Sequence, residues 1–374
     1  MEPKIGSLSI KRFRALREIN ISPLGRVNLI TGRNNAGKSS ILEALRLLAS
    51  NASPAVIFDI LRYREEAEDI SAESSRRFDL EGAFPISSLF HGFPELSKKL
   101  EPVEIKSNGS QRPMELSFEI GWFPEVRTPE GTSRLDTQAT LFDEEDAVAA
   151  LKISSGGDSR VVRLDSYGRN AYRARPFRME SSDESRLNCI FVSAYGGERT
   201  GTLGSMWDKI ALSDHEEHVV DALRIIDPNI SAISMVGGES PGRSRTAIVK
   251  SQALARPVPL RSFGDGLNRL FGIVLSLVNA KDGLLLIDEF ENGMHFSIQT
   301  DTWRTIFKLA NRLNVQVMAT SHSWDAIESF QRAASESPED GVLIRLSRKG
   351  DDIIPTIFRE DELTIATRER IEVR

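Results

Sequence analysis

The pattern of a phosphate-binding loop, G-x-x-x-x-G-K-[ST], is matched in full by Gly32-Arg33-Asn34-Asn35-Ala36-Gly37-Lys38-Ser39. A mostly apolar run, Val27 to Ile30, precedes the loop, and apolar residues at helical spacing follow it over residues 41–48. The order is strand, glycine loop, helix, which is the context that distinguishes a phosphate site from a chance glycine turn.

Each residue type in this loop has a physical reason. Glycines let the backbone wrap around phosphate groups, so that its N–H groups and the helix N-terminus point at negative charge. We expect Lys38 to neutralise β- and γ-phosphate oxygens and the Ser39 hydroxyl to bind Mg²⁺. The other residues expected to line the nucleotide are Gly32, Arg33, Asn34, Asn35, Ala36, Gly37 and Ser40.

A second buried strand is predicted at Leu284 to Ile287, and it ends in the carboxylates of Asp288 and Glu289. Charges at the tip of an apolar strand are costly unless a cation or a proton pairs with them. We expect Asp288 to hold Mg²⁺ through its water shell and Glu289 to act as the general base on the attacking water. The alternative is a solvated turn at the end of the strand.

His322 follows a further predicted strand, Val315 to Ala319. Carboxyl ends of parallel strands share one ligand-binding edge, so His322 should lie beside the two motifs above. A lone histidine is more often structural, but this shared edge makes it a candidate catalytic residue.

The element order predicts an α/β fold. Helix patterns at 267–278 and 298–313 alternate with the apolar strands, which indicates a mostly parallel sheet covered on both faces. Near the N-terminus, alternation over residues 8–21 predicts a hairpin or a short antiparallel sheet. We place the N-terminal part of the core at 1–50, an inserted lobe at 51–188, the C-terminal part of the core at 189–335, and closing strands and a helix at 336–374.

Shorter elements are expected within and beside the inserted lobe. Strand patterns occur at Met114 to Ile120, Cys189 to Tyr195 and Ala247 to Lys250. A helix over Val219 to Ile226 should stop at the Asp227-Pro228 pair.

The order and spacing of these motifs resemble the ABC-type ATPases, in the branch that contains SMC-type proteins and OLD-like AAA family ATPases. The run Asp288-Glu289-Phe290-Glu291-Asn292-Gly293-Met294-His295 is similar to a Walker B strand entering a D-loop, with His322 as the switch histidine. The stretch 261–269 is similar to the signature segment, although Phe263 stands where the family usually has a glycine. It could instead be a glycine-rich helix cap.

This resemblance implies a P-loop NTPase fold with an ABC-ATPase head, an N-terminal antiparallel β subdomain and an inserted lobe. It also implies ATP as the nucleotide and a head-to-tail homodimer, or a higher even-numbered assembly. The opposite copy would then contact the γ-phosphate through its own Ser262, Gly264, Asp265 and Gly266, since glycines at a helix N-terminus favour anions. Hydrolysis would loosen the dimer.

Two features separate the chain from neighbouring families. It has no long heptad run, as an SMC protein would need. Too few residues follow His322 for the Toprim nuclease of OLD proteins, so an effector protein would act in trans. The expected function is a regulatory ATPase of an anti-phage or stress system.

Composition limits the class of protein and the cellular compartment. The net charge of −6 gives no overall basic excess, and Cys189 is the single cysteine, which excludes a disulfide framework. No window of the sequence reaches the length of an apolar membrane span. We expect a cytoplasmic protein without a membrane partner.

An arginine-rich stretch favours a second hypothesis, a DNA-binding repair or recombination ATPase of the SMC-like class. Interleaved aromatic residues there could stack bases while the arginines grip phosphates, although a solvated face or a dock for an acidic protein fits equally well. The arginines are Arg160, Arg163, Arg169, Arg173, Arg175 and Arg178. The acidic run 143–146 is read as a solvated turn, and His91, His215 and His218 receive no role.

Overall fold

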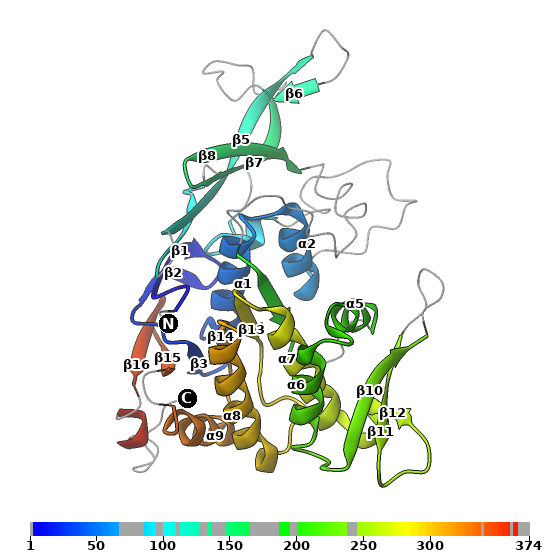
Figure 1. Ribbon diagram of the computed structural model, residues 1–374. Helices are drawn as coiled ribbons and strands as arrows, with labels where there is room; N and C mark the ends of the chain where they lie inside the picture. Colours follow the sequence, from blue (N-terminus) through cyan, green and yellow to red (C-terminus); the bar gives the residue numbers. More distant parts are fainter. Residues whose placement is uncertain are drawn as a thin grey trace.

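The computed structural model describes most of the chain (Figure 1). The described residues are 3–66, 86–94, 100–109, 113–127, 133–135, 147–164, 187–194, 200–237, 245–337, 340–359 and 362–365. They form a central sheet with helices on both faces, a second, antiparallel sheet built on the N-terminal hairpin, and a small third sheet. The predicted α/β fold is confirmed.

The central sheet has six strands in the order β16-β15-β3-β14-β13-β9. Their bounds are Asp352–Phe358, Gly341–Lys349, Val27–Gly32, Gln316–Thr320, Leu284–Ile287 and Cys189–Val192. All neighbours run parallel except β15 and β16, which are antiparallel. The sheet is therefore mostly parallel, as predicted, and strands distant in sequence become neighbours within it.

Side chains of β13 alternate between two hydrophobic cores. Leu285 and Ile287 enter one core with helices on that face, and Leu284 and Leu286 enter the other. A strand that is covered on both faces in this way needs an unbroken run of apolar residues. The helices of the first core are α5 Thr200–Ile210, α6 Asp214–Leu223, α7 Asp265–Asn279, α8 Phe296–Arg312 and α9 Trp324–Ala334.

Helix α1, Lys38–Ala49, fills the second core between the central sheet and the antiparallel sheet. Every residue of α1 except Ser39 is buried. An ion pair also joins α1 to the N-terminal hairpin, where Arg14 Nε lies 2.5 Å from Glu43 Oε2. Arg64, just past α2 (Pro54–Tyr63), donates to the other Glu43 oxygen at 2.7 Å. The helix behind the glycine loop is thus anchored by packing and by a buried ion-pair cluster.

The antiparallel sheet joins the N-terminal hairpin to strands of the inserted region, in the order β2-β1-β4-β5-β7-β8, with β6 paired to β5. The bounds of β1, β2, β4, β5, β6, β7 and β8 are Ser7–Phe13, Leu16–Ile21, Val103–Asn108, Met114–Arg127, Ser133–Leu135, Ala147–Ser155 and Asp158–Arg163. The predicted hairpin is present, but its sheet continues across the boundary predicted at residue 50. The long pair β5 and β7 extends away from the central sheet (Figure 1).

The third sheet comprises β10 Ile230–Val236, β11 Thr246–Ser251 and β12 Val258–Pro259, and it lies beside α6. Helix α6 begins earlier than predicted, because Ser213 accepts a hydrogen bond from the His215 N–H and caps it, and it ends at Leu223. The strand expected over 189–195 ends at Val192, and Tyr195 lies outside the described residues. Among the helices described, none combines the length and apolar character that crossing a membrane requires.

Candidate active site

The glycine loop lies between β3 and α1, as its sequence predicts. Gly37 has φ of 83°, and a Cβ there would lie 2.9 Å from side-chain carbons of both Leu16 and Ile353. At Gly32, with φ of 146°, a Cβ would lie 2.6 Å from the Leu346 carbonyl oxygen. Both positions therefore exclude side chains through backbone conformation and close packing.

Lys38 is the first residue of α1, and its side chain is buried. Its Nζ donates to the carbonyl oxygens of Gly32 at 2.7 Å and Arg33 at 3.0 Å, so the ammonium curls over the loop. Burial lowers the pKa of Lys38 from its usual 10.5, and the nearby carboxylates of Asp288, Glu289 and Glu291 oppose that shift. A negatively charged ligand over this loop would meet a poorly solvated cation.

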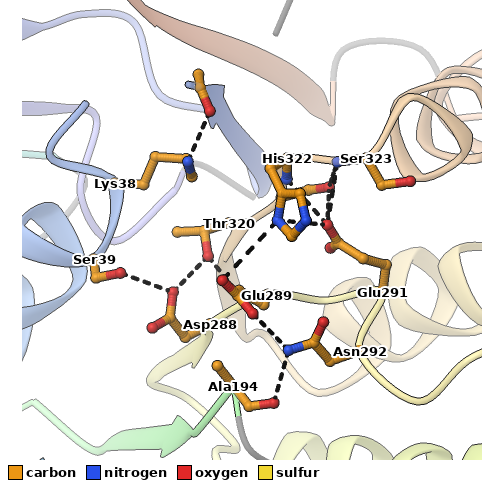
Figure 2. Close-up of polar contacts among 12 residues, drawn as sticks. Lys38, Ser39, Ala194, Asp288, Glu289, Glu291, Asn292, Thr320, His322 and Ser323 are labelled. Atoms are coloured by element: carbon orange, nitrogen blue, oxygen red, sulfur yellow. Dashed lines mark hydrogen bonds and ion pairs between the residues drawn. The ribbon is translucent and has the colours of Figure 1, made fainter. Parts of the chain in front are cut away.

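Asp288 follows β13 directly and is almost fully buried. Its Oδ1 accepts hydrogen bonds from Ser39 Oγ at 3.2 Å and from Thr320 Oγ1 at 2.6 Å (Figure 2). The structure thus brings the two predicted metal ligands, Ser39 and Asp288, into contact. Hydroxyl and carboxylate oxygens are the donors that Mg²⁺ prefers, and an Mg²⁺ ion bound beside phosphates needs few protein ligands. The donor set therefore fits Mg²⁺.

Glu289, the candidate base, has a left-handed backbone with φ of 47°. Such a conformation is strained for a non-glycine residue and persists only when its surroundings hold it. Here the Glu289 N–H donates to Thr320 Oγ1 at 2.8 Å. The side chain is held too, since Asn292 Nδ2 donates to Glu289 Oε2 at 2.5 Å and to the Ala194 carbonyl at 3.0 Å (Figure 2).

His322 lies beside this carboxylate, with its Nδ1 4.0 Å from Glu289 Oε1 and 3.3 Å from Glu291 Oε1. Its side chain is 49% exposed, so the ring could contact a ligand. The sequence pattern therefore located Asp288, Glu289 and His322 at one edge of the sheet, where the structure brings them together. It assigned no individual role to Thr320, Glu291 and Asn292, although the last two belong to the run that resembles a D-loop.

The signature-like segment is exposed at the start of α7. Ser262 belongs to the short 3₁₀ helix η3, Leu260–Phe263, and Gly264, with φ of 96°, caps α7 at Asp265. Ser262, Gly264 and Asp265 are exposed, and a Cβ on Gly264 would meet no atom within 4 Å. Phe263, at the position where a glycine was expected, is partly buried against the first core. The segment therefore presents an open backbone turn to solvent.

Helix α7 also carries a residue that links the signature-like segment to the backbone of Asp288 and Glu289. Arg269 is buried, and its guanidinium donates to the carbonyl oxygens of Asp288 at 2.8 Å, Glu289 at 2.9 Å and Ser193. Gly293 lies against the same helix, since a Cβ on it would be 3.7 Å from Asp265 Cβ. The signature helix and the end of β13 are therefore held together.

The remaining sequence candidates have varied surroundings. Arg160 Nη2 donates to the carbonyl oxygens of Asn51 and Ala52, so it supports the end of α1 within the fold. His91 Nδ1 is 2.8 Å from the Arg14 carbonyl oxygen. Burial raises the pKa of the Cys189 thiol to about 12. Outside the described residues lie the acidic run 143–146 and four of the arginines, Arg169, Arg173, Arg175 and Arg178.

Two family models match the chain. One, described as "AAA ATPase domain", matches residues 4–128, which include the glycine loop. The other, described as "AAA domain, putative AbiEii toxin, Type IV TA system", matches residues 199–327, which include Asp288, Glu289 and His322. The chain thus carries AAA ATPase domain sequence in two segments, one with the glycine loop and one with Asp288, Glu289 and His322.

Individual relatives differ in how much of the chain they cover. A Helicobacter pylori protein named "ATP/GTP phosphatase" is 25% identical over 383 residues, covering 96% of each chain. The "DNA replication and repair protein RecF" of Coxiella burnetii is 43% identical over 51 residues, or 14% of each chain. Among solved structures, an Smc head domain from Pyrococcus furiosus bound to the C-terminal domain of ScpA covers all of both chains at 11% identity, with a TM-score of 0.49.

Proposed function

We propose that this chain binds ATP with Mg²⁺ over residues 32–40 and hydrolyses it with Glu289 as general base and His322 as a second polar group. One observation carries the proposal. The ends of β13 and β14 place the Asp288 carboxylate in hydrogen-bond contact with the glycine loop, and they place Glu289 next to it. The two AAA domain matches, which between them include the residues of this site, support the same chemistry.

The side chains have separable roles in this proposal. Lys38 would exchange its carbonyl partners for phosphate oxygens, and its poorly solvated charge would gain from that exchange. Bound Mg²⁺, held by Ser39 and Asp288, would neutralise charge on the phosphates. The Glu289 carboxylate, already oriented by Asn292, would accept a proton from the attacking water.

The proposed assembly is a head-to-tail homodimer in which each nucleotide lies between the glycine loop of one copy and Ser262 to Gly266 of the other. The exposed turn at Gly264 supports this arrangement, because open backbone N–H groups at a helix N-terminus favour an anion. Phe296, at the start of α8, is 60% exposed and would add an apolar contact between the two copies. ATP would join the halves, and hydrolysis would release them.

Two variants test the hydrolytic switch. Lys38→Ala should abolish nucleotide binding in an equilibrium titration, whereas Glu289→Gln should bind ATP, hydrolyse it far more slowly and remain dimeric for longer by light scattering. The unaltered chain, with and without ATP, is the reference. If Glu289→Gln hydrolyses ATP at the parental rate, the general-base assignment is wrong.

At the cellular level, we propose an OLD-like sensor ATPase of an anti-phage or stress system that restrains or releases an effector in trans. The support is the description of the second family model, which names a toxin–antitoxin system. Co-purification of the chain with the products of its genomic neighbours, with and without ATP, tests this. A partner retained in only one nucleotide state would support it, and equal recovery in both states would contradict it.

A DNA-binding repair ATPase is the second candidate, supported by the match of 51 residues to RecF proteins. Arg163 and the arginines that follow it would supply phosphate contacts. DNA affinity would then fall steeply between about 50 and 200 mM salt. Absence of binding at the lowest salt would reject this candidate in favour of the first.

A further inference from the structure

Glu291 lies on the loop after β13 and contacts the chain around His322 with one carboxylate oxygen. Its Oε1 accepts hydrogen bonds from Ser321 Oγ at 2.9 Å, from the His322 N–H at 3.0 Å and from the Ser323 N–H at 3.1 Å. The same oxygen is 3.3 Å from His322 Nδ1. Figure 2 shows the imidazole between the carboxylates of Glu289 and Glu291. A single side-chain oxygen therefore holds both the backbone and the ring of His322.

This arrangement is costly for stability alone. The Glu291 side chain is only 10% exposed, and its Oε2 is buried with no hydrogen-bond donor among the residues that the structure describes. A buried oxygen without a hydrogen-bond partner destabilises the folded state, and more so when the group is charged. An apolar residue would avoid that cost, but it would leave the N–H groups of His322 and Ser323 unheld.

The contact also couples two strands of the site. Glu291 and Glu289 belong to the same loop after β13, whereas His322 follows β14. Any shift of the D-loop-like segment would be transmitted to His322 through Glu291 Oε1. Meanwhile Asn292, the next residue along, holds Glu289. Adjacent side chains thus fix the two candidate catalytic groups separately.

We infer that Glu291 is a positioning residue for His322, which sets the orientation of the ring toward the bound nucleotide and transmits the state of the loop after Glu289. This inference rests on the proposed function. It assigns Glu291 a role that acts through His322, because the four contacts of its Oε1 all involve residues 321–323.

Two substitutions separate positioning from general damage. Glu291→Ala removes the acceptor, so kcat for ATP should fall roughly 10- to 100-fold, the cost of a misplaced reacting group, while the Kd for ATP stays within about twofold. Glu291→Gln keeps an oxygen that can accept the two N–H groups, so it should recover most of kcat. Glu217→Ala, on an exposed turn of α6, is the matched surface control.

A double variant tests whether Glu291 acts through His322. If it does, Glu291→Ala combined with His322→Ala should hydrolyse ATP no more slowly than His322→Ala alone. Multiplicative losses would show that Glu291 acts elsewhere and would overturn the inference. Equal thermal midpoints of the variants and the parent exclude unfolding as the cause.

Amide hydrogen exchange provides a readout that does not need hydrolysis. The amides of His322 and Ser323 should exchange faster in Glu291→Ala than in the parent and in Glu291→Gln. Unchanged exchange in Glu291→Ala overturns the inference whatever the rate of hydrolysis. Conversely, if exchange is faster in Glu291→Ala but the parent protein does not hydrolyse ATP, the contact between Glu291 and the chain around His322 stands and the proposed function is rejected.

Discussion

Thr320 Oγ1 lies 2.6 Å from Asp288 Oδ1, at the point where the parallel pairing of β13 with β14 ends. The same hydroxyl accepts the Glu289 N–H at 2.8 Å. The Thr320 hydroxyl therefore orients two groups. It donates its proton to Asp288, the candidate metal ligand, and it accepts a hydrogen bond from the backbone of Glu289, the candidate base. The hydroxyl can make both bonds because it is donor and acceptor at once.

Replacement of Thr320 by valine keeps the shape of the side chain and removes both hydrogen bonds. Loss of a group that orients a metal ligand typically lowers metal affinity or activity roughly 10- to 100-fold. We expect such a loss in ATP hydrolysis, together with a higher Mg²⁺ concentration for half-maximal rate, measured by phosphate release. Thr320→Ser retains the hydroxyl and should stay near the parental rate. A valine variant with parental Mg²⁺ dependence would contradict this.

Asn292 offers a test of the Glu289 orientation. Asn292→Ala removes the donor to Glu289 Oε2, so kcat should fall roughly tenfold as the carboxylate samples unproductive positions. Asn292→Asp should be worse, because it places a like charge beside Glu289. Steady-state kinetics with parallel nucleotide titrations checks this order. An aspartate variant more active than the alanine variant would refute it.

Arg269 should contribute to stability as well as to the site. Arg269→Ala leaves the carbonyl oxygens of Ser193, Asp288 and Glu289 without this donor inside the protein. The free energy of unfolding should fall by about 3 kcal/mol, as expected for buried acceptors left unpaired. Urea denaturation measures the change. Arg312→Ala, an exposed arginine at the end of α8, is the control and should unfold like the parent.

Nucleotide affinity should depend on pH through Lys38. Burial lowers the pKa of Lys38, so its ammonium loses a proton below the usual value of 10.5. Nucleotide affinity should therefore be highest below the pKa that Lys38 has in the folded protein. It should decrease as pH rises through that pKa, because the uncharged amine no longer attracts phosphate. Titration with a fluorescent ATP analogue between about pH 7 and 10.5 should show this alkaline limb. Lys38→Ala should bind weakly without such a limb, and parental affinity unchanged up to pH 10.5 would contradict the prediction.

The parts of the fold that the sequence predicts best are those with unbroken apolar runs. Strands β3, β13 and β14 are buried on both faces, so their runs and the polar residues after them stand out. Helix α9 and the strands β4, β7 and β8 did not stand out. Strand β8, for example, consists of exposed and partly buried residues, so it has no apolar pattern of its own, although it pairs with β7 directly before it in the sequence.

The site shows the same division. Lys38, Asp288 and Glu289 follow from motif and position, because a strand end dictates where each side chain goes. Glu291, Asn292 and Thr320 are ordinary polar residues, and only the curl of the loop after β13 reveals which atoms they touch. The role of Arg269 could not be predicted from sequence either. An arginine on a mostly apolar helix face only interrupts the apolar pattern, and the pattern does not show that it donates hydrogen bonds to backbone carbonyl oxygens after a neighbouring strand.

The position of β3 has a consequence for how the protein is made. Strand β3 pairs with β14 and β15, which are translated close to 300 residues later. Until the ribosome has released β14 and β15, the apolar strand β3 has no strands to pair with, and the glycine loop is not supported by the central sheet. Nascent chains stalled before Gln316 should therefore be unable to retain nucleotide, and they would depend on chaperones to stay free of aggregation.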